Sequence, residues 1–329
     1  MQPLQDQFHR QIKDLRISVT DRCNYRCFYC KPANGFSDRF RSGLMSYEEI
    51  HRFARLFAQM GVNKIRLTGG EPLIRKELER LIEMLASIPG IDDIAMTTNA
   101  YLLPRKAKQL KAAGLTRLTI SLDSLRPKRF AEITRDDSFD KVMAGVQAAE
   151  DAGFTPLKFN AVIIRGVNED EVIDFVEYSR KTGHWIRFIE FMPLDEDKRW
   201  TMKDVYSYKE ILDDMAKVGK VVPLPSKDPS ETARNFTFED GLGKIGIIAS
   251  VTQNFCAECS RSRLTADGKM RACLFSHKEY DLLAKAREGA SDNELIDFIR
   301  HGIWQKQAGH SIHLPGFEPP TRSMSRIGG

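Results

Sequence analysis

Three cysteines near the amino terminus have the type and spacing of an iron–sulfur ligand set. Cys23, Cys27 and Cys30 follow a C-x3-C-x2-C pattern. Cubane clusters normally take four cysteine thiolates, so three thiolates leave one iron without a protein ligand. An open metal position is where a substrate or cofactor binds, as it is at a catalytic zinc. The spacing therefore predicts a four-iron cluster with one reactive iron.

Zinc and a disulfide match this first triplet less well. A structural zinc takes four ligands, and the nearest histidine, His9, precedes Cys23 by 14 positions. A disulfide needs an even number of cysteines. The cluster is therefore the favoured interpretation.

A second set of three cysteines, Cys256, Cys259 and Cys273, lies in the last third of the chain. His277 could complete a zinc site of three cysteines and one histidine, and this alternative stays open. Two three-cysteine sites in one chain favour a second cluster whose free iron meets a substrate. Arg261-Ser262-Arg263 lies between the ligands. Because arginine forks match phosphate oxygens, we expect this segment to hold an anionic substrate.

Strand-like and helix-like stretches alternate through the first two hundred residues. The expected strands are residues 15–20, 64–68, 94–98, 118–122, 158–164 and 185–191, and the expected helices are residues 46–60, 76–87, 104–113, 138–152 and 169–182. Repeated β/α units predict parallel strands covered by helices. Eight units close a barrel, so six predict an incomplete (β/α)6 TIM-type barrel. An open doubly wound sheet is the alternative, although no G-x-G-x-x-G follows the first strand.

The composition changes after residue 191, where proline and short β-like pieces dominate up to residue 230. Beyond them we expect a strand over residues 244–250, a hairpin over residues 263–271 with Asp267-Gly268 at its turn, and a helix over residues 291–300. We place a boundary near residue 195. It divides the chain into a barrel domain, residues 1–195, and a C-terminal module with the second cluster, residues 196–329.

The motifs fall at the ends of expected strands, where α/β barrels carry their catalytic residues. The first triplet follows the first strand, and Thr68-Gly69-Gly70-Glu71-Pro72 follows the second. Paired glycines let backbone approach a ligand closely, although a lone pair is most often only a turn.

The composition limits the partners. The chain has 329 residues, is 42% hydrophobic and carries a net charge of +5 from 50 basic and 45 acidic residues. Without a long basic tract it offers no case for nucleic acid or a membrane surface, but it allows a basic pocket for a small anion. No signal segment or membrane-length apolar stretch is apparent, which predicts a cytoplasmic protein with reduced thiols.

The full pattern resembles the radical S-adenosylmethionine (SAM) enzymes and, among them, the molybdenum cofactor biosynthesis protein A family of GTP 3′,8-cyclases. The resemblance runs from Leu15 to the C-terminus. It rests on both cysteine triplets, Tyr29 before Cys30, the Gly-Gly-Glu-Pro segment, Arg261-Ser262-Arg263 and the terminal Ile327-Gly328-Gly329. It implies a lyase that cleaves SAM to a 5′-deoxyadenosyl radical. This radical takes hydrogen from C3′ of GTP, and C3′ attacks C8 to give 3′,8-cyclo-7,8-dihydro-GTP, the first step of molybdenum cofactor biosynthesis.

The same resemblance implies two [4Fe–4S] clusters, SAM and a set of contact residues. It places the clusters on Cys23, Cys27 and Cys30 and on Cys256, Cys259 and Cys273. It assigns SAM contacts to Tyr29, Gly70, Ser121 and Met192, GTP contacts to Arg16, Lys64, Arg66, Thr97, Lys158, Arg187, Arg261, Ser262 and Arg263, and catalytic roles to Arg16, Arg326, Gly328 and Gly329. Ala100 departs from the family pattern, in which a glycine often follows Thr97-Thr98-Asn99.

The implied partners are GTP as substrate, an electron donor such as flavodoxin or ferredoxin, and the next enzyme, cyclic pyranopterin monophosphate synthase. The resemblance is compatible with a homodimer and implies neither a nucleic-acid nor a membrane partner. Two other classes are a peptide-modifying radical SAM enzyme and a zinc-stabilised binding module without catalysis. The basic residues and the terminal glycines argue against the first, and brown colour after anaerobic purification would exclude the second.

Overall fold

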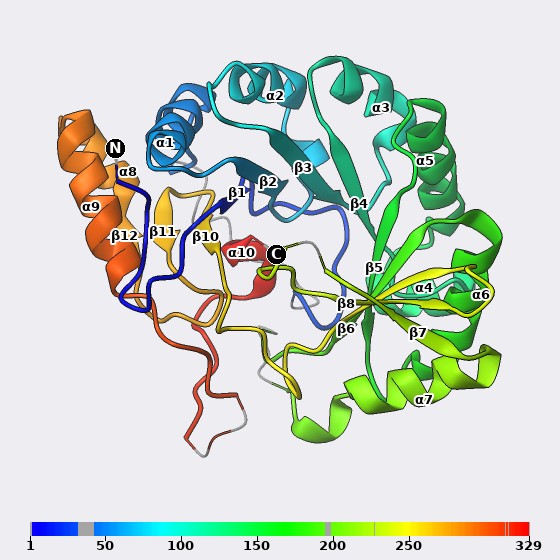
Figure 1. Cartoon of the computed structure of the whole chain (residues 1–329). Coiled ribbons are helices and arrows are strands. Elements are labelled where there is room, and N and C mark those ends of the chain that lie inside the picture. The colour runs from blue at the N-terminus through cyan, green and yellow to red at the C-terminus, as the bar shows by residue number, and fades with distance from the viewer. Residues whose placement is uncertain are drawn as a thin grey trace.

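One curved sheet organises the chain (Figure 1). The computed structural model describes residues 2–31, 43–194, 199–226, 228–312, 314 and 316–328. Within these residues twelve strands form a sheet in the order β12-β11-β10-β1-β2-β3-β4-β5-β6-β9-β8-β7. The strands are β1 (Asp14–Ser18), β2 (Lys64–Thr68), β3 (Asp93–Thr98), β4 (Arg117–Ser121), β5 (Lys158–Ile163), β6 (Trp185–Glu190), β7 (Val221–Leu224), β8 (Arg234–Phe238), β9 (Lys244–Ile248), β10 (Arg261–Leu264), β11 (Lys269–Arg271) and β12 (Tyr280–Asp281).

Helices cover the outer face of the sheet, and the C-terminal helix lies on its inner side (Figure 1). The α-helices are α1 (Tyr47–Gln59), α2 (Leu78–Ala86), α3 (Leu103–Ala112), α4 (Pro127–Thr134), α5 (Phe139–Asp151), α6 (Val172–Thr182), α7 (Tyr208–Val218), α8 (Leu282–Arg287), α9 (Asp292–Trp304) and α10 (Met324–Ile327). Short 3-10 helices are η1 (Pro72–Ile74), η2 (Glu169–Glu171) and η3 (Met202–Asp204). Ser46 begins α1 with the capping box that its sequence predicts.

The six expected strands are present, and each pairs in parallel with the next one along the chain, from β1 to β6. A doubly wound sheet would reverse its order at a switch point. The unbroken order therefore confirms the incomplete barrel.

The C-terminal part of the chain extends this same sheet at both ends. Strand β9 adds in parallel to β6, and β10 adds in parallel to β1. The predicted hairpin is formed by β10 and β11, with Arg263 opposite Arg271. The predicted domain boundary near residue 195 falls among residues 195–198, outside the described residues, and stays a prediction.

The expectation of only short β-like pieces over residues 192–230 was wrong, because this stretch contains α7. Ser207 and Glu210 form a capping box at its start, and Ile211 and Met215 are buried one turn apart. These signals are legible in the sequence, but the neighbouring prolines obscured them. Helices α4 and α8 were also missed.

Strand alternation gives the sheet two chemically different faces. In β1, Leu15 and Ile17 are fully buried in the main hydrophobic core. Arg16, between them, takes the opposite face, because successive side chains of a strand alternate. The register places Arg16 beside Arg66 of β2 and Arg263 of β10. The inner face therefore carries a row of basic side chains.

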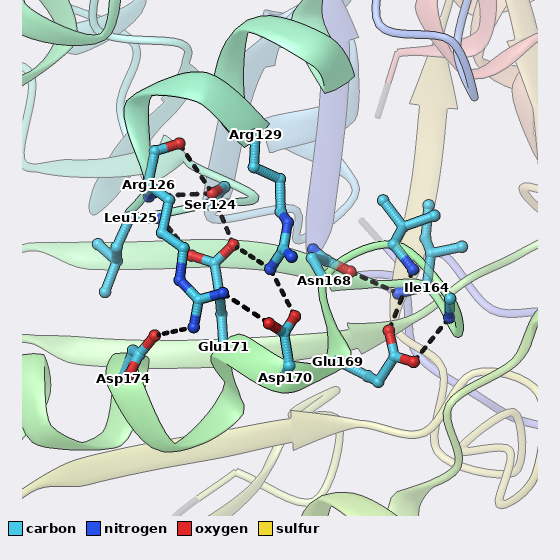
Figure 2. Close-up of polar contacts among 12 residues, drawn as sticks. Ser124, Leu125, Arg126, Arg129, Ile164, Asn168, Glu169, Asp170, Glu171 and Asp174 are labelled. Carbon is cyan, nitrogen blue, oxygen red and sulfur yellow. Dashed lines mark hydrogen bonds and ion pairs between the residues drawn. The ribbon is translucent and has the colours of Figure 1, made fainter.

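A polar network fixes the loop after β4 to η2 and α6 (Figure 2). The buried carboxylate of Glu171 accepts hydrogen bonds from Ser124 Oγ and Leu125 N, both at 2.7 Å. Arg129 Nη1 lies 2.9 Å from the same carboxylate. Asn168 donates to the backbone carbonyl of Asp123 at 2.7 Å. These contacts hold the backbone that carries Asp123 into the barrel mouth.

None of the helices in the described part of the chain is long and apolar enough to cross a bilayer.

Candidate active site

The first cysteine triplet lies on the loop that leaves β1. The backbone N–H groups of Cys30 and Lys31 both donate to the Cys27 carbonyl, at 2.9 and 3.0 Å, so a tight turn brings the thiols together. Burial, and then the charge of Glu71, raises the pKa of Cys23 to about 12. Burial also raises the pKa of Cys27, as does the neighbouring Cys30. Thiols in such surroundings become thiolates only beside a strong positive charge, which an iron cluster provides.

The two triplets fit a cluster through their donor chemistry. Within the described residues no three Cys, His, Asp or Glu side chains are close enough to share one metal ion. A cubane offers a separate iron to each thiolate, so the three sulfurs need not converge on one point. Cys23, Cys27 and Cys30 still influence one another electrostatically, as do Cys256, Cys259 and Cys273.

The Gly69-Gly70 pair holds the loop that leads into the first triplet. Gly70 N donates to the Thr20 carbonyl at 2.8 Å, and a Cβ on Gly70 would lie 2.1 Å from the Arg22 carbonyl oxygen. Only glycine permits this approach of two backbones. The close contact in the structure is thus with the triplet's own loop. The expected SAM contact at Gly70 stays a prediction.

Asp123 is a site carboxylate that the sequence interpretation missed, and Glu71 is one that it named within the Gly-Gly-Glu-Pro segment without giving it a role. Glu71 is buried and accepts from Leu73 N, Thr98 Oγ1 and Asn99 N at 3.0, 2.7 and 2.7 Å. Burial raises its pKa to about 7, although these hydrogen bonds oppose the shift. Both residues lie just past a strand end, the signal that would have identified them.

Asp123 fixes Tyr29, the aromatic residue inside the first triplet. The Tyr29 hydroxyl donates to Asp123 Oδ2 at 2.5 Å, and Val162 N donates to Oδ1 at 2.8 Å. The Tyr29 ring meets Phe191 edge-on, with centroids 6.2 Å apart. Burial raises the pKa of Asp123 to about 6. Tyr29 is therefore held from both sides beside the thiols.

The remaining predicted SAM contacts also lie at strand ends. Ser121 ends β4 and pairs in register with Asn160 of β5. Met192 follows β6 and packs against a second hydrophobic cluster that includes Leu194 and Ile327. Ala100 has a φ of +64°, which explains why the family often has glycine there.

Most of the predicted GTP contacts meet on the inner face of the sheet. Arg66 Nη1 lies 3.4 Å from Thr97 Oγ1 and 3.3 Å from Thr119 Oγ1, and Arg187 Nη2 donates to Thr119 at 3.1 Å. The Lys158 ammonium lies 5.6 Å from the centroid of the Trp185 ring. Neutral hydroxyls and a ring are weak partners for these cations. The arrangement leaves their charge available to an anion.

Burial and mutual repulsion lower the pKa values of this basic set. The pKa of Arg187 falls to about 9 through burial and then the charge of Arg66. The pKa of Lys158 falls to about 8 through burial and then the charge of Arg187. Burial and Arg263 lower the pKa of Arg16, whose Nε, like that of Arg187, is buried without a hydrogen-bond partner. A bound polyanion would remove the repulsion and fill these positions.

The residues of the Arg261-Ser262-Arg263 segment have different surroundings. Arg261 Nη1 donates to the Ser230 carbonyl at 2.9 Å, and Arg263 Nη1 donates to the Gly328 carbonyl. Ser262 Oγ donates to the Arg271 carbonyl at 3.3 Å and is fully buried. A GTP contact at Ser262 would therefore come from its backbone. Lys64, on β2, is paired with Asp228 at 2.8 Å.

The second triplet is enclosed by basic residues. Burial raises the pKa of Cys259, but the charges of Lys306 and Arg261 outweigh it and lower the pKa to about 6. His277, the alternative zinc ligand, is exposed, and its Nε2 lies 3.1 Å from the Glu318 carbonyl. The His277 ring therefore contacts the Glu318 carbonyl and not a thiol of the second triplet.

The C-terminal tail lies inside the curved sheet (Figure 1). Ile327 is fully buried, and Met324 N donates to the Leu194 carbonyl at 3.2 Å. A Cβ on Gly328 would lie 2.8 Å from Thr68 Oγ1 and 3.1 Å from Ser18 Cβ. Hydrogen bonds from Ser325 oppose the burial that raises the pKa of Cys30. The tail thus reaches both the first triplet and Arg263.

The catalytic roles of two further residues stay predictions. Arg326 is half-buried on α10. Gly329 lies outside the described residues.

Comparisons with known proteins agree with this geometry. A family model described as "Radical SAM superfamily" matches residues 17–179, and one described as "Molybdenum Cofactor Synthesis C" matches residues 184–312. A "GTP 3′,8-cyclase" of Rhodopirellula baltica is 47% identical over 330 residues, covering 99% of this chain and 92% of the relative. A "GTP 3′,8-cyclase, mitochondrial" of Arabidopsis thaliana is 43% identical, covering 98% and 83%. The crystal structure of Streptococcus suis SuiB has a TM-score of 0.64 at 14% identity, covering 98% of this chain and 76% of that one.

Proposed function

This chain belongs to the GTP 3′,8-cyclases of the radical SAM superfamily, and we propose how its described residues divide the reaction among themselves. The enzyme converts GTP to 3′,8-cyclo-7,8-dihydro-GTP, the first step of molybdenum cofactor biosynthesis. When its iron–sulfur cluster and SAM are bound, they supply the radical chemistry that joins C3′ of GTP to C8 of the guanine.

Cys23, Cys27 and Cys30 hold the first cluster in this proposal. Tyr29, Gly70, Ser121 and Met192 would bind the SAM. The hydrogen bond from Tyr29 to Asp123 supports this assignment, because it fixes an aromatic side chain beside the thiols without using its ring faces. The residues of this end of the barrel orient SAM and exclude water from a reactive centre.

The inner face of the sheet binds GTP in this proposal. The residues are Arg16, Lys64, Arg66, Thr97, Lys158, Arg187, Arg261, Ser262 and Arg263. The observation that carries the assignment is a half-buried set of cations whose pKa values are lowered by loss of solvent and by one another. A triphosphate supplies the compensating charge that these residues lack.

In this proposal Cys256, Cys259 and Cys273 would hold a second [4Fe–4S] cluster, whose free iron would be available to the substrate. Arg263 connects this region to the tail, since it donates to Gly328 from the strand that follows the second triplet's first two cysteines. Arg326, Gly328 and Gly329 take part in the reaction in this proposal, and the contact of Gly328 with Ser18 and Thr68 supports it. A tail in this position would help to keep solvent from a carbon radical.

The remaining partners are proposals from the family. An electron donor such as flavodoxin or ferredoxin reduces the first cluster, and the product passes to cyclic pyranopterin monophosphate synthase. A cytoplasmic location and a homodimer also remain predictions. The observed family replaces the peptide-modifying enzyme and the non-catalytic zinc module as interpretations of the whole chain.

An anaerobic turnover assay tests the function. Reconstituted protein is incubated with dithionite, SAM and GTP, and the products are identified by mass spectrometry. We expect 5′-deoxyadenosine and the cyclic nucleotide in equal amounts. Cleavage of SAM without any consumption of GTP would contradict the proposal.

A binding variant tests the site separately from the chemistry. Replacing Arg66→Met removes a charged contact, and a hydrogen bond to a charged group contributes about 1.5–3 kcal/mol, so GTP affinity should fall roughly 10- to 150-fold. The matched control is Lys220→Met, because Lys220 is 71% exposed and pairs with Glu239 on the surface. Equal affinity of the Arg66 variant and the control would remove Arg66 from the GTP site.

A further inference from the structure

Lys306 is a buried cation to which the proposed function gives no role. It follows α9, where its backbone N–H donates to the Ile303 carbonyl at 2.9 Å. The whole residue is only 2% exposed. Burying an ammonium costs several kcal/mol unless hydrogen bonds and an opposite charge compensate for it. The groups that compensate for the buried charge of Lys306 therefore indicate its role.

The partners of the Lys306 ammonium are the Arg261 carbonyl and the second cysteine triplet. Nζ donates to the Arg261 carbonyl at 2.5 Å, and the ammonium interacts electrostatically with the side chain of Cys259. In the described part of the chain it forms no ion pair with a carboxylate. The acidic side chains that interact with it are Cys259 and Cys273, and the nearby guanidinium of Arg261 repels it. The sulfur ligands of a second cluster would therefore supply its compensating charge.

The N-terminal segment holds Lys306 in this position. Gln7 Nε2 donates to the Lys306 carbonyl at 3.1 Å. Arg10 donates to the carbonyls of Gln307, Ala308 and Cys256 at 2.7, 2.7 and 2.6 Å. Arg10 is itself neutralised by the buried Asp6, at 2.6 Å. This clamp fastens the segment after α9 to the loop of the second triplet, so the ammonium is placed before any cluster arrives.

We propose that Lys306 is a positioning residue of the second iron–sulfur cluster, whose ammonium donates to the sulfur of Cys259 and ties that ligand to β10. The inference rests on the proposed second cluster. Hydrogen bonds to the ligand sulfurs and the local net charge set the reduction potential of such clusters. A fixed ammonium stabilises the more negative, reduced state and raises that potential. Through the Arg261 carbonyl it also fixes the cluster relative to the strand of Arg261 and Arg263.

The test compares the reduction potentials of the two clusters in the holoenzyme. Anaerobically reconstituted protein is titrated potentiometrically and followed by electron paramagnetic resonance, with iron and sulfide measured on the same samples. The first cluster's signal is identified because SAM changes it. The variants are Lys306→Met, which removes the charge, and Lys306→Arg, which keeps a cationic donor. The control is Lys220→Met, which removes an exposed ammonium.

The second cluster of Lys306→Met should be at least tenfold harder to reduce, a shift of about 59 mV for one electron. The first cluster should be unchanged, and Lys306→Arg should recover most of the shift. A full second cluster with wild-type potential in Lys306→Met would overturn the inference. Loss of the second cluster in Lys306→Met that is not restored in Lys306→Arg would also overturn it. This outcome would show that Lys306 only maintains the local structure. Wild-type protein with iron for one cluster only would instead refute the proposed second cluster itself.

Discussion

Gly328 offers a sharp test of whether the C-terminal tail takes part in the reaction. Its backbone lies against β1 and β2, and its carbonyl accepts a hydrogen bond from Arg263. Replacing it by alanine adds a single methyl group next to Thr68 and Ser18. The substitution leaves every cysteine and every basic side chain in place.

The structure sets the size of the effect. Gly328 has a φ of +88°, where a residue with a side chain is strained by roughly 1–3 kcal/mol. Its new Cβ would also lie 2.8 Å from Thr68 Oγ1, which forces the tail or β2 to move. Since about 1.4 kcal/mol is a factor of ten, the docked tail should become about 5- to 150-fold less favoured. Turnover should fall by a similar factor if docking is required.

The assay is anaerobic conversion of GTP, with iron content and thermal unfolding as controls for assembly. The matched variant is Gly289→Ala. Gly289 also has positive φ, +95°, but no atom lies within 4 Å of its added Cβ, so this variant has the strain without the collision. Truncation after Ile327, which removes Gly328 and Gly329, should keep both clusters and stop conversion. Wild-type turnover by either tail variant would refute a role for the tail in the reaction.

Three further predictions concern single side chains. Cys27→Ser should abolish SAM cleavage, because the cluster loses one of three protein ligands while the backbone bonds to the residue 27 carbonyl remain; a normal yield of 5′-deoxyadenosine from iron-loaded protein would contradict this. Cys256→Ala should lower the iron content by one cluster and spare the other, whereas one equivalent of zinc in the wild type would show that the triplet is a zinc site. Burial lowers the pKa of Lys158 to about 8, so this side chain is charged below that pH and loses its proton as the pH rises through it. GTP affinity, measured calorimetrically, should therefore fall between about pH 7 and pH 9. It should fall less in Lys158→Arg, which stays charged. Identical dependence of GTP affinity on pH in the wild type and Lys158→Arg would exclude titration of Lys158 as the cause.

Local patterns allowed much of the fold to be predicted. The strands β1 to β6 were predicted from apolar runs that alternate with helical stretches, and α1 from the capping box at Ser46. Helix α7 was missed although Ser207 and Glu210 carry the same signal. The participation of β9 and β10 in the main sheet was not predicted. It depends on pairing between strands far apart in the chain, which no local pattern reports.

Part of the site could also be predicted. The two cysteine triplets were recognised as candidate ligand sets because metal coordination depends on residue type and spacing. The long-range contacts around them could not be predicted, although the place of Asp123 at a strand end marks it as a candidate. Asp123 meets Tyr29, and Lys306 meets Cys259, across 94 and 47 positions of the chain. Whether a lysine or a carboxylate is a solvated charge or a buried partner depends on the neighbours that folding supplies.

The sequence by itself determined the chemistry of this protein, since three thiolates at this spacing leave an iron open wherever the loop lies. Only the tertiary structure decided what surrounds that chemistry. Parallel register brought Arg16, Arg66 and Arg263 to one level of the inner face. Burial then lowered the pKa values of these three arginines. The tail lies so close to Ser18 and Thr68 at Gly328 that an added side chain would collide with them, and this proximity exists only in the folded chain.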